Sequence, residues 1–395
     1  MNANTLFGFR KSVTGLLCGI AVFSSASIAY AQSWVAIPSP TTQTLFGMDC
    51  GTSSVCVAVG MNGAVIRTTD HKTWTTGTSG TTAAIVGVDM YSATVGIAVG
   101  ASGLILKTID GGATWSSVTG ITTETLYSVS MATSSIAYIT GTNGVAFKTT
   151  DGGATWSDIS SGLGGTSMYS IDAYSSSTVY VAGANGVAYK TTNSGAAWTA
   201  LTTGTTESIY AVDAMSTTIA FIGGTSGLVK KTTDGATFIA QTLSGFGSGE
   251  AVVDLSCTTS SLCLVSGGQG TVNITGNGGS TWTEETMPSA AQLGGAANFA
   301  VGRRFVVGAN GVIFALDAYG PAAVGSLALS TGGTSTTDTT PEFTWTDSTD
   351  NESSIASYAI DVDSSGTYTN MGDVNTYALT AALSAGSHTV TVIAV

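Results

Sequence analysis

Short apolar runs of about four to six residues recur along most of the chain, separated by turns rich in Gly, Ser and Thr. This alternation predicts short β-strands rather than helices. A Gly-x-x-Gly turn sets the period: its first glycine stands at Gly60, Gly100, Gly141, Gly183, Gly224, Gly267 and Gly308, at spacings of 40, 41, 42, 41, 43 and 41 residues. Two apolar runs precede each turn, as at 126–131 and 136–140, and two shorter ones follow it. Four short strands in each period predict the blades of a β-propeller.

The two ends of this array indicate how the ring closes. The seventh period reaches Asp317 without a last aromatic strand, and Ser33–Ile37 offers such a strand at the other end. Trp34 then completes a set of outer-strand aromatics with Trp74, Trp115, Trp156, Trp198, Phe238 and Trp282. A blade shared between the two ends leaves no exposed sheet edge. We therefore expect an all-β fold: a closed seven-bladed propeller over residues 32–319, with N-terminal strand closure.

Six of the seven periods also carry the pattern Ser/Thr-x-Asp-x-Gly-x-Thr-Trp or a variant of it, complete at 149–156. It resembles the Asp-box, or BNR repeat, of sialidase-type propellers, and its centres are Asp70, Asp110, Asp151, Asn193, Asp234 and Asn277. An Asp or Asn side chain can accept backbone N–H bonds within its own turn. We interpret these residues as hairpin braces and not as catalytic carboxylates.

The period, the number of blades and the wording of the repeat resemble the photosystem II stability and assembly factor-like propeller family, over residues 33–320. The resemblance implies a non-enzymatic propeller outside the cytoplasm; photosynthetic members assist assembly of reaction-centre protein in the thylakoid lumen. Those members use an Arg-rich surface. Here only Arg67, Arg303 and Arg304 follow the N-terminal leader, so the sequence departs from the family at this point.

Composition and charge agree with an exported all-β protein. Only 9% of residues are charged, Gly numbers 52 and Pro 5, and 43% are hydrophobic, which excludes a disordered chain. Without Arg10 and Lys11 of the leader, 9 bases face 24 acids, a net charge of −15. Such a field repels nucleic acid.

Residues 1–31 have the features of a signal peptide: a basic start, an apolar stretch at 13–28 and Ala29-Tyr30-Ala31 as a cleavage site. An uncleaved membrane helix is the alternative, but Gly and Ser interrupt the stretch. No later segment is apolar for long enough to span a membrane as a helix.

Four of the five cysteines lie after residues 1–31 and form two matching pairs, Cys50 with Cys56 and Cys257 with Cys263. Each pair brackets a Ser/Thr-rich turn between two apolar runs. The C-x5-C spacing is not typical of zinc sites, and an exported protein meets an oxidising compartment. We expect two local disulfide bonds.

The repeat pattern ends before Tyr319, and a different sequence pattern follows. Residues 320–340 indicate a linker and a first strand, and 341–395 resemble an Ig-like or fibronectin type III-like module with Trp345 as its core aromatic. One more strand is expected after the last residue, so we interpret the module as incomplete. Calcium at Asp347, Asp350 and Glu352 is one interpretation of its acidic loops; a solvated acidic surface is the favoured one.

Carboxylates on the first strand of several blades offer the main alternative to a binding protein, a sialidase-like or other glycoside hydrolase. They are Asp49, Asp89, Asp172, Asp213 and Asp254. We interpret their recurrence as blade architecture. His71 and His388 are too few for a metal cluster or a triad, and Arg303 with Arg304 is interpreted as an exposed hairpin tip. No catalytic, cofactor or metal residue is predicted.

A base stands three residues before most Asp-box centres: Arg67, Lys107, Lys148, Lys190 and Lys231. These bases could dock an acidic partner, or their stems could cover a blade face while the charge stays hydrated. The prediction is a monomeric exported scaffold whose propeller face binds a protein or glycan, with no cofactor. A carbohydrate-active enzyme is the alternative.

Overall fold

The computed structural model describes residues 7–14, 23–27, 33–51, 55–118, 120–247, 249–299 and 303–317, and the strands β31 to β36 of the C-terminal part. The chain divides into two compact units. Trp34–Leu316 forms one of them, and Met1–Ser33 with Asp317–Val395 forms the other. No helix in the described part of the chain is long and apolar enough to cross a membrane.

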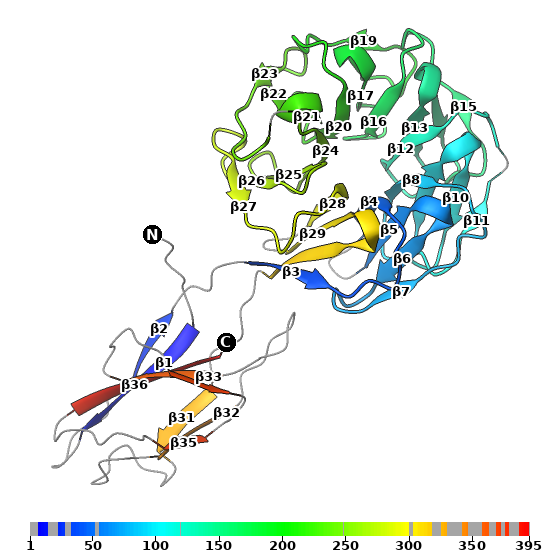
Figure 1. Cartoon of the computed structure of the whole chain (residues 1–395). Coiled ribbons are helices and arrows are strands. Elements are labelled where there is room, and N and C mark those ends of the chain that lie inside the picture. The colour runs from blue at the N-terminus through cyan, green and yellow to red at the C-terminus, as the bar shows by residue number, and fades with distance from the viewer. Residues whose placement is uncertain are drawn as a thin grey trace. The chain divides into compact units, whose positions relative to one another are not determined.

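The first unit is a ring of seven four-stranded antiparallel sheets around an axis (Figure 1). Blades 1 to 3 comprise β4 (Leu45–Cys50), β5 (Cys56–Gly60), β6 (Val65–Thr68), β7 (Trp74–Thr76); β8 (Ile85–Asp89), β9 (Gly96–Gly100), β10 (Ile105–Thr108), β11 (Ser116–Ser117); and β12 (Leu126–Met131), β13 (Ala137–Gly141), β14 (Ala146–Thr149), β15 (Ser157–Asp158). Blades 4 to 6 comprise β16 (Met168–Asp172), β17 (Val179–Gly183), β18 (Ala188–Thr191), β19 (Thr199–Ala200); β20 (Ile209–Ala214), β21 (Ala220–Gly224), β22 (Leu228–Thr232), β23 (Ile239–Ala240); and β24 (Val252–Cys257), β25 (Cys263–Gly267), β26 (Val272–Thr275), β27 (Thr283–Glu285). The predicted seven-bladed propeller is confirmed.

Blade 7 draws its strands from both ends of the propeller. β28 (Leu293–Phe299), β29 (Arg303–Gly308) and β30 (Ile313–Asp317) are completed by β3 (Ser33–Ile37), which lies beside β30. Trp34 is 5% exposed and packs with Val306 and Phe314 of the same blade. The predicted N-terminal strand closure is therefore present.

The Gly-x-x-Gly turns join the second and third strands of six blades through short 3-10 turns: Met61–Gly63, Ala101–Gly103, Thr142–Gly144, Ala184–Gly186, Thr225–Gly227 and Ala309–Gly311. Both glycines of the first turn are required by geometry. A Cβ atom on Gly60 would lie 2.1 Å from the Thr44 carbonyl oxygen, and Gly63 has φ +72°. This explains why the turn is the most regular feature of the sequence.

The second unit contains two sheets, described here by themselves. One has the order β2 (Phe23–Ser27), β1 (Phe7–Thr14), β36 (Ser387–Ala394), β33 (Tyr358–Val362), β34 (Thr369–Gly372); the other has β31 (Gly325–Leu329), β32 (Glu342–Thr346), β35 (Thr376–Ala378). β1 and β2 come from the segment predicted to be a signal peptide. Its cleavage and the Ig-like nature of the module stay predictions, and Asp347, Asp350 and Glu352 lie outside the described residues.

Candidate interaction site at the propeller axis

Five aspartates on inner strands link five of the seven pairs of neighbouring blades around the axis. One carboxylate oxygen of each accepts a 2.7 Å hydrogen bond from a main-chain N–H of the following inner strand. The pairs are Asp49 with Met90, Asp89 with Met131, Asp172 with Ala214, Asp213 with Cys257, and Asp254 with Ala296. These carboxylates therefore hold neighbouring blades in register.

The expected equivalence of these five aspartates is wrong for Asp254. Val252 pairs with Gly267 as Leu45 pairs with Gly60, so Asp254 lies two positions before the place that Asp49 occupies in its own blade. Ser256 takes that place in blade 6, and its hydroxyl accepts the N–H of Asn298 at 3.0 Å. Asp254 is thus a separate feature of blade 6.

Burial and mutual repulsion raise the pKa of these carboxyl groups. Burial raises the pKa of Asp172 to about 6 and that of Asp254 to about 7, against the backbone hydrogen bonds that favour the charged forms. The pKa of Asp89 lies well above its ordinary value because burial is joined by repulsion from Asp49. All five residues keep some accessible surface. None of the five forms an ion pair with a described residue, so the axis carries uncompensated acidity.

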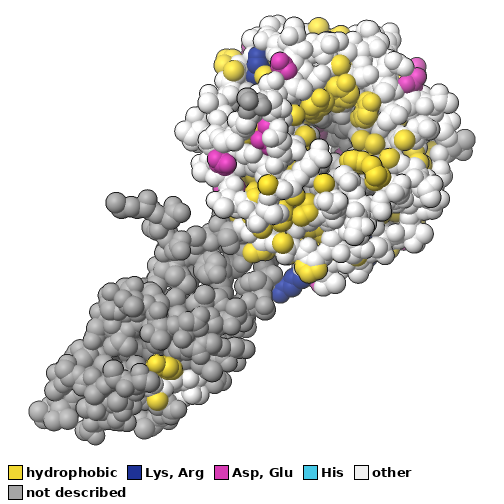
Figure 2. Space-filling model, viewed as in Figure 1, with side chains coloured by type: hydrophobic (Ala, Val, Ile, Leu, Met, Phe, Trp, Pro, Cys, Tyr) yellow, Lys and Arg dark blue, Asp and Glu magenta, His cyan; other side chains and the backbone are white. Residues whose placement is uncertain are grey.

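An apolar collar surrounds one end of this channel. It consists of the residues in second position of the inner strands, all half-buried: Phe46, Val86, Tyr127, Tyr169, Tyr210 and Val253. The Tyr169 ring lies 5.3 Å from the rings of both Tyr127 and Tyr210, centroid to centroid. Figure 2 shows hydrophobic side chains gathered around the central opening of the propeller. The sequence analysis missed this collar, although its tyrosines follow the repeat period.

The Asp-box residues brace their own hairpins. Asp110 Oδ1 accepts the N–H of Thr114 at 2.9 Å and the Thr108 hydroxyl at 2.8 Å, while Thr108 Oγ1 accepts the N–H of Gly112 at 2.9 Å. Asp151 and Asn193 repeat this pattern, Asp70 and Asp234 close variants of it, and Asn277 binds the N–H of Thr281 at 2.9 Å. The hydrogen bonds lower the pKa of the exposed Asp234 to about 2. The side-chain oxygens of the Asp-box residues accept hydrogen bonds from within their own turns, as the interpretation as hairpin braces predicts.

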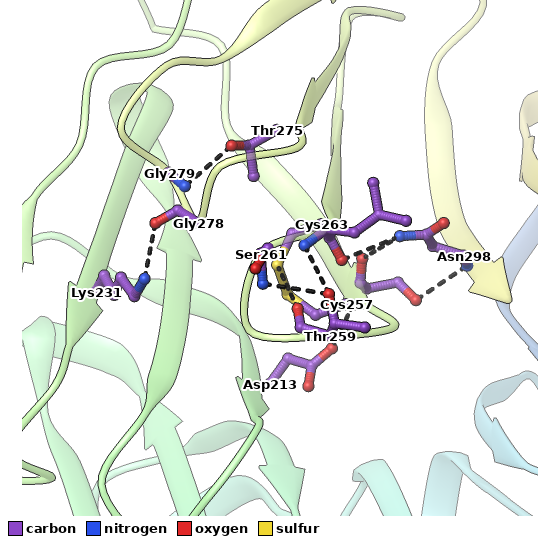
Figure 3. The surroundings of a disulfide bond; sticks show 12 residues. Asp213, Lys231, Cys257, Thr259, Ser261, Cys263, Thr275, Gly278, Gly279 and Asn298 are labelled. Carbon is purple, nitrogen blue, oxygen red and sulfur yellow. Dashed lines mark hydrogen bonds between the residues drawn. A yellow bond between two sulfur atoms is a disulfide. The ribbon is translucent and has the colours of Figure 1, made fainter. Parts of the chain in front are cut away.

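Several of the basic side chains that precede the Asp-boxes donate hydrogen bonds to main-chain carbonyl groups. Arg67 Nε donates to the carbonyl of Gly111 at 2.7 Å, in the Asp-box turn of the next blade. Lys231 Nζ likewise donates to the carbonyl of Gly278 at 2.8 Å (Figure 3). Lys190 Nζ binds the Thr217 carbonyl at 2.5 Å and lies 5.3 Å from the Tyr180 ring centroid. Lys148 likewise lies over Tyr138, and Lys107 lies near Gly152. These contacts connect blades, which neither interpretation from sequence anticipated.

The blade aromatics pack between neighbouring blades. Trp282 meets Phe221 of blade 5 edge-on at 6.4 Å, Trp74 meets Phe305 of blade 7 at 5.8 Å, and Trp198 Nε1 donates to the Ile159 carbonyl at 2.8 Å. Trp115 and Phe238 are buried, and Trp156 is half-buried. His71 is buried in the Asp-box turn of blade 1, with its ring 5.5 Å from that of Phe305. The side chain of His388 lies outside the described residues.

Cross-strand links reinforce three consecutive blades at the closure of the ring. Cys50–Cys56 and Cys257–Cys263 form the two predicted disulfides in blades 1 and 6. Figure 3 shows the second of them. In blade 7, Asn298 and Arg304 pair across the strands in the same place, with Arg304 Nε donating to Asn298 Oδ1 at 3.1 Å. Arg304 is only 7% exposed, so its interpretation as an exposed hairpin tip is wrong. The side chain of Arg303 lies outside the described residues.

The described residues contain no group of three or more His, Cys, Asp or Glu side chains placed to hold a metal ion. What the site offers is a rigid ring, an acidic axis and an apolar collar at its mouth. These features suit the binding of another molecule.

Comparison with known proteins agrees with the repeat pattern. Residues 66–240 match the family model described as photosynthesis system II assembly factor YCF48. The family resemblance is confirmed. No curated protein sequence matches the chain.

Solved structures share the fold at low sequence identity. YCF48 bound to D1 peptide is 18% identical, with a TM-score of 0.59 over 72% of this chain and 94% of that one. YCF48 from Cyanidioschyzon merolae is 20% identical, with a TM-score of 0.59 over 72% and 98%. The GH74 xyloglucanase from Xanthomonas campestris is 12% identical, with a TM-score of 0.56 over 71% of this chain and 53% of that one. Identities this low support the fold alone.

Proposed function

We propose that this protein is a non-enzymatic, exported binding scaffold whose propeller face docks a protein partner, in the manner of an assembly factor. The observation that carries the proposal is the collar: a half-buried apolar surface around the mouth of a ring whose blades are tied together by carboxylates, bases and disulfides. A half-buried apolar patch on a rigid frame favours binding, because little order has to be imposed on association. The family match and a relative solved with a bound peptide support a protein as the ligand.

Export is the second part of the proposal. Two disulfide bonds support an oxidising compartment, and the N-terminal leader supports transport to it. Periplasm, cell surface, extracellular space and, in a photosynthetic host, the thylakoid lumen all satisfy this condition.

A carbohydrate-active enzyme is the second candidate, favoured by the xyloglucanase among the similar folds and by the raised pKa of Asp254. Against it, all five axis carboxylates already accept main-chain hydrogen bonds, which is a structural use. Incubation with xyloglucan, aryl glycosides and sialosides is expected to give no turnover. Turnover that Asp172→Asn or Asp254→Asn abolishes would replace the proposal.

In-cell crosslinking of the native protein, with mass spectrometry of each cell fraction, tests the scaffold directly. Crosslinks to reaction-centre subunits or their precursors in thylakoids would support photosystem assembly. Crosslinks only to envelope or surface proteins would overturn that role and support a surface scaffold. If no protein is crosslinked above the background of an unrelated exported protein, the scaffold proposal fails.

A further inference from the structure

The collar tyrosines differ from other tyrosines of the propeller in how their hydroxyl groups are used. Tyr138 and Tyr180 donate hydrogen bonds to the carbonyls of Ser176 and Thr217, at 2.6 and 2.8 Å. The hydroxyls of Tyr127, Tyr169 and Tyr210 make no hydrogen bond with a described residue. A tyrosine at a binding surface typically offers an apolar ring and a polar tip to a ligand.

These three rings lie on consecutive blades and contact each other in series, with centroid distances of 5.3 Å. The series presents π-systems along one arc of the channel mouth. Cations bind such faces, and an arc of several rings can contact a cation and an apolar neighbour together.

Aspartates near the three tyrosine rings favour a positively charged ligand. Asp254 directly follows Val253 of the collar, and Asp172 and Asp213 lie three residues farther along their strands than Tyr169 and Tyr210. At about 3.3 Å per residue, Asp172 and Asp213 lie roughly 10 Å farther along their strands than the rings, whereas Asp254 lies next to the collar. No described Lys or Arg forms an ion pair with them, as noted above. Because the pKa of Asp172 is about 6 and that of Asp254 about 7, both groups are mainly ionised at pH 8, so a cation entering at the collar would meet carboxylates without an ion-pair partner, whereas an anion would be repelled.

We propose that the collar binds an extended segment of the partner protein in which an apolar residue stands next to a Lys or Arg, with the cation directed past Tyr169 toward Asp254. This inference rests on the proposed scaffold function and names its ligand chemistry. The apolar residue contacts the tyrosine rings, and the cation gains both the ring faces and the carboxylates.

A peptide titration tests the site on the full chain. The probe is the capped peptide Gly-Ser-Leu-Arg-Leu-Arg-Leu-Ser-Gly with a fluorophore, measured by anisotropy beside matched peptides that carry citrulline or Glu in place of Arg. We expect the Arg peptide to bind at least tenfold more tightly than the citrulline peptide and the Glu peptide to bind most weakly. Tyr169→Ala is expected to weaken the Arg peptide about tenfold, and Tyr169→Phe to keep most of the affinity.

The matched control is Tyr174→Ala, which removes a tyrosine that is 47% exposed and lies after β16, at the other end of the inner strand from Tyr169. It should leave the affinity unchanged, and thermal melting should show Tyr169→Phe and Tyr174→Ala to be folded. Equal affinity for the three peptides, no binding of any, or an unchanged affinity in Tyr169→Ala would overturn the site. Tyr169-dependent binding of a neutral xyloglucan oligosaccharide in place of the Arg peptide would overturn it in favour of a glycan ligand.

Crosslinking of the same variants separates this inference from the function beneath it. If wild type and Tyr169→Ala capture the same protein partners with equal yield, the collar is not the site and the scaffold function stands. If the wild-type protein captures no partner, the scaffold function itself fails.

Discussion

Asp254→Asn should change the stability of the propeller in opposite directions at high and low pH. Asp254 accepts main-chain N–H groups with both carboxylate oxygens, from Ala296 at 2.7 Å and from Leu255 at 2.8 Å. Its pKa is about 7 in the folded protein, raised by burial from an ordinary value of 3.8. The substitution removes the charge and keeps one of the two acceptors.

The sign follows from proton linkage. Because the pKa is higher in the folded state, the Asp254 carboxyl stabilises the fold below pH 3.8, and this stabilisation is lost as the pH rises through about 7. The difference in pKa corresponds to a cost of up to about 4 kcal/mol at pH 8. Asn has no such cost but leaves one N–H without its acceptor, a loss of about 1 kcal/mol. Asp254→Asn should thus stabilise the propeller by about 2 to 3 kcal/mol at pH 8 and destabilise it by about 1 kcal/mol at pH 4.

Guanidinium unfolding followed by tryptophan fluorescence measures this, since six of the 7 tryptophans lie in propeller blades. Asp158→Asn is the control: Asp158 is exposed, and hydrogen bonds from Ser160 lower its pKa, so the stabilisation that it gives is lost only below pH 3.8 and its removal should cost a little stability, with the same sign, at pH 8 and at pH 4. A stability change of Asp254→Asn that has the same sign at both pH values would refute the reasoning.

Three further substitutions test the contacts between blades. Lys231→Met removes the 2.8 Å hydrogen bond to Gly278 and should lower the free energy of unfolding by about 1 kcal/mol, whereas Lys72→Met, at an exposed site, should change it little. Equal effects of the two substitutions in a urea titration would contradict a stabilising role of this contact between blades. Replacing Cys257 and Cys263 by Ser opens a loop with a sequence separation of 6 and should cost about 2 kcal/mol in denaturant unfolding, whereas dithiothreitol, which also opens Cys50–Cys56, should cost the wild type about twice as much. Trp34→Ala removes a side chain that is 5% exposed and its 3.3 Å hydrogen bond to Glu285, so about 3 to 5 kcal/mol should be lost. Hydrogen exchange of that variant should accelerate first in β3 and β30, and uniform acceleration over all blades would argue against their role in closure.

The fold could be predicted because the repeat makes local requirements visible. Glycines at the blade turns are forced by close carbonyls, as at Gly60, and the Asp-box ties each residue to partners within five positions. Trp34 was recognisable because one aromatic was missing from an otherwise regular series. Local geometry of this kind can be predicted from the spacing of residues, because the interacting residues are close in the sequence.

Contacts between blades could not be predicted in the same way. The bond from Lys231 to Gly278 spans 47 residues, and nothing near Lys231 marks its acceptor. Asp254 is a different case, because its position could have been read from the sequence: Asp49 directly precedes Cys50, whereas Ser256, and not Asp254, directly precedes Cys257. The buried position of Arg304 could not be predicted from its neighbours in the sequence. Only the pairing of Asn298 with Arg304 across the two strands shows that these residues take the place of a disulfide in blade 7.

Photo-crosslinking from the collar tests the central claim most directly. p-Benzoylphenylalanine is placed at Tyr169 in one strain and at Tyr174 in another, and living cells are irradiated before the adducts are identified by mass spectrometry. The account predicts discrete protein adducts from position 169, mapping to a segment that carries Lys or Arg beside an apolar residue, and none from position 174. Adducts from position 174 alone, or from neither position, would contradict a protein-binding collar.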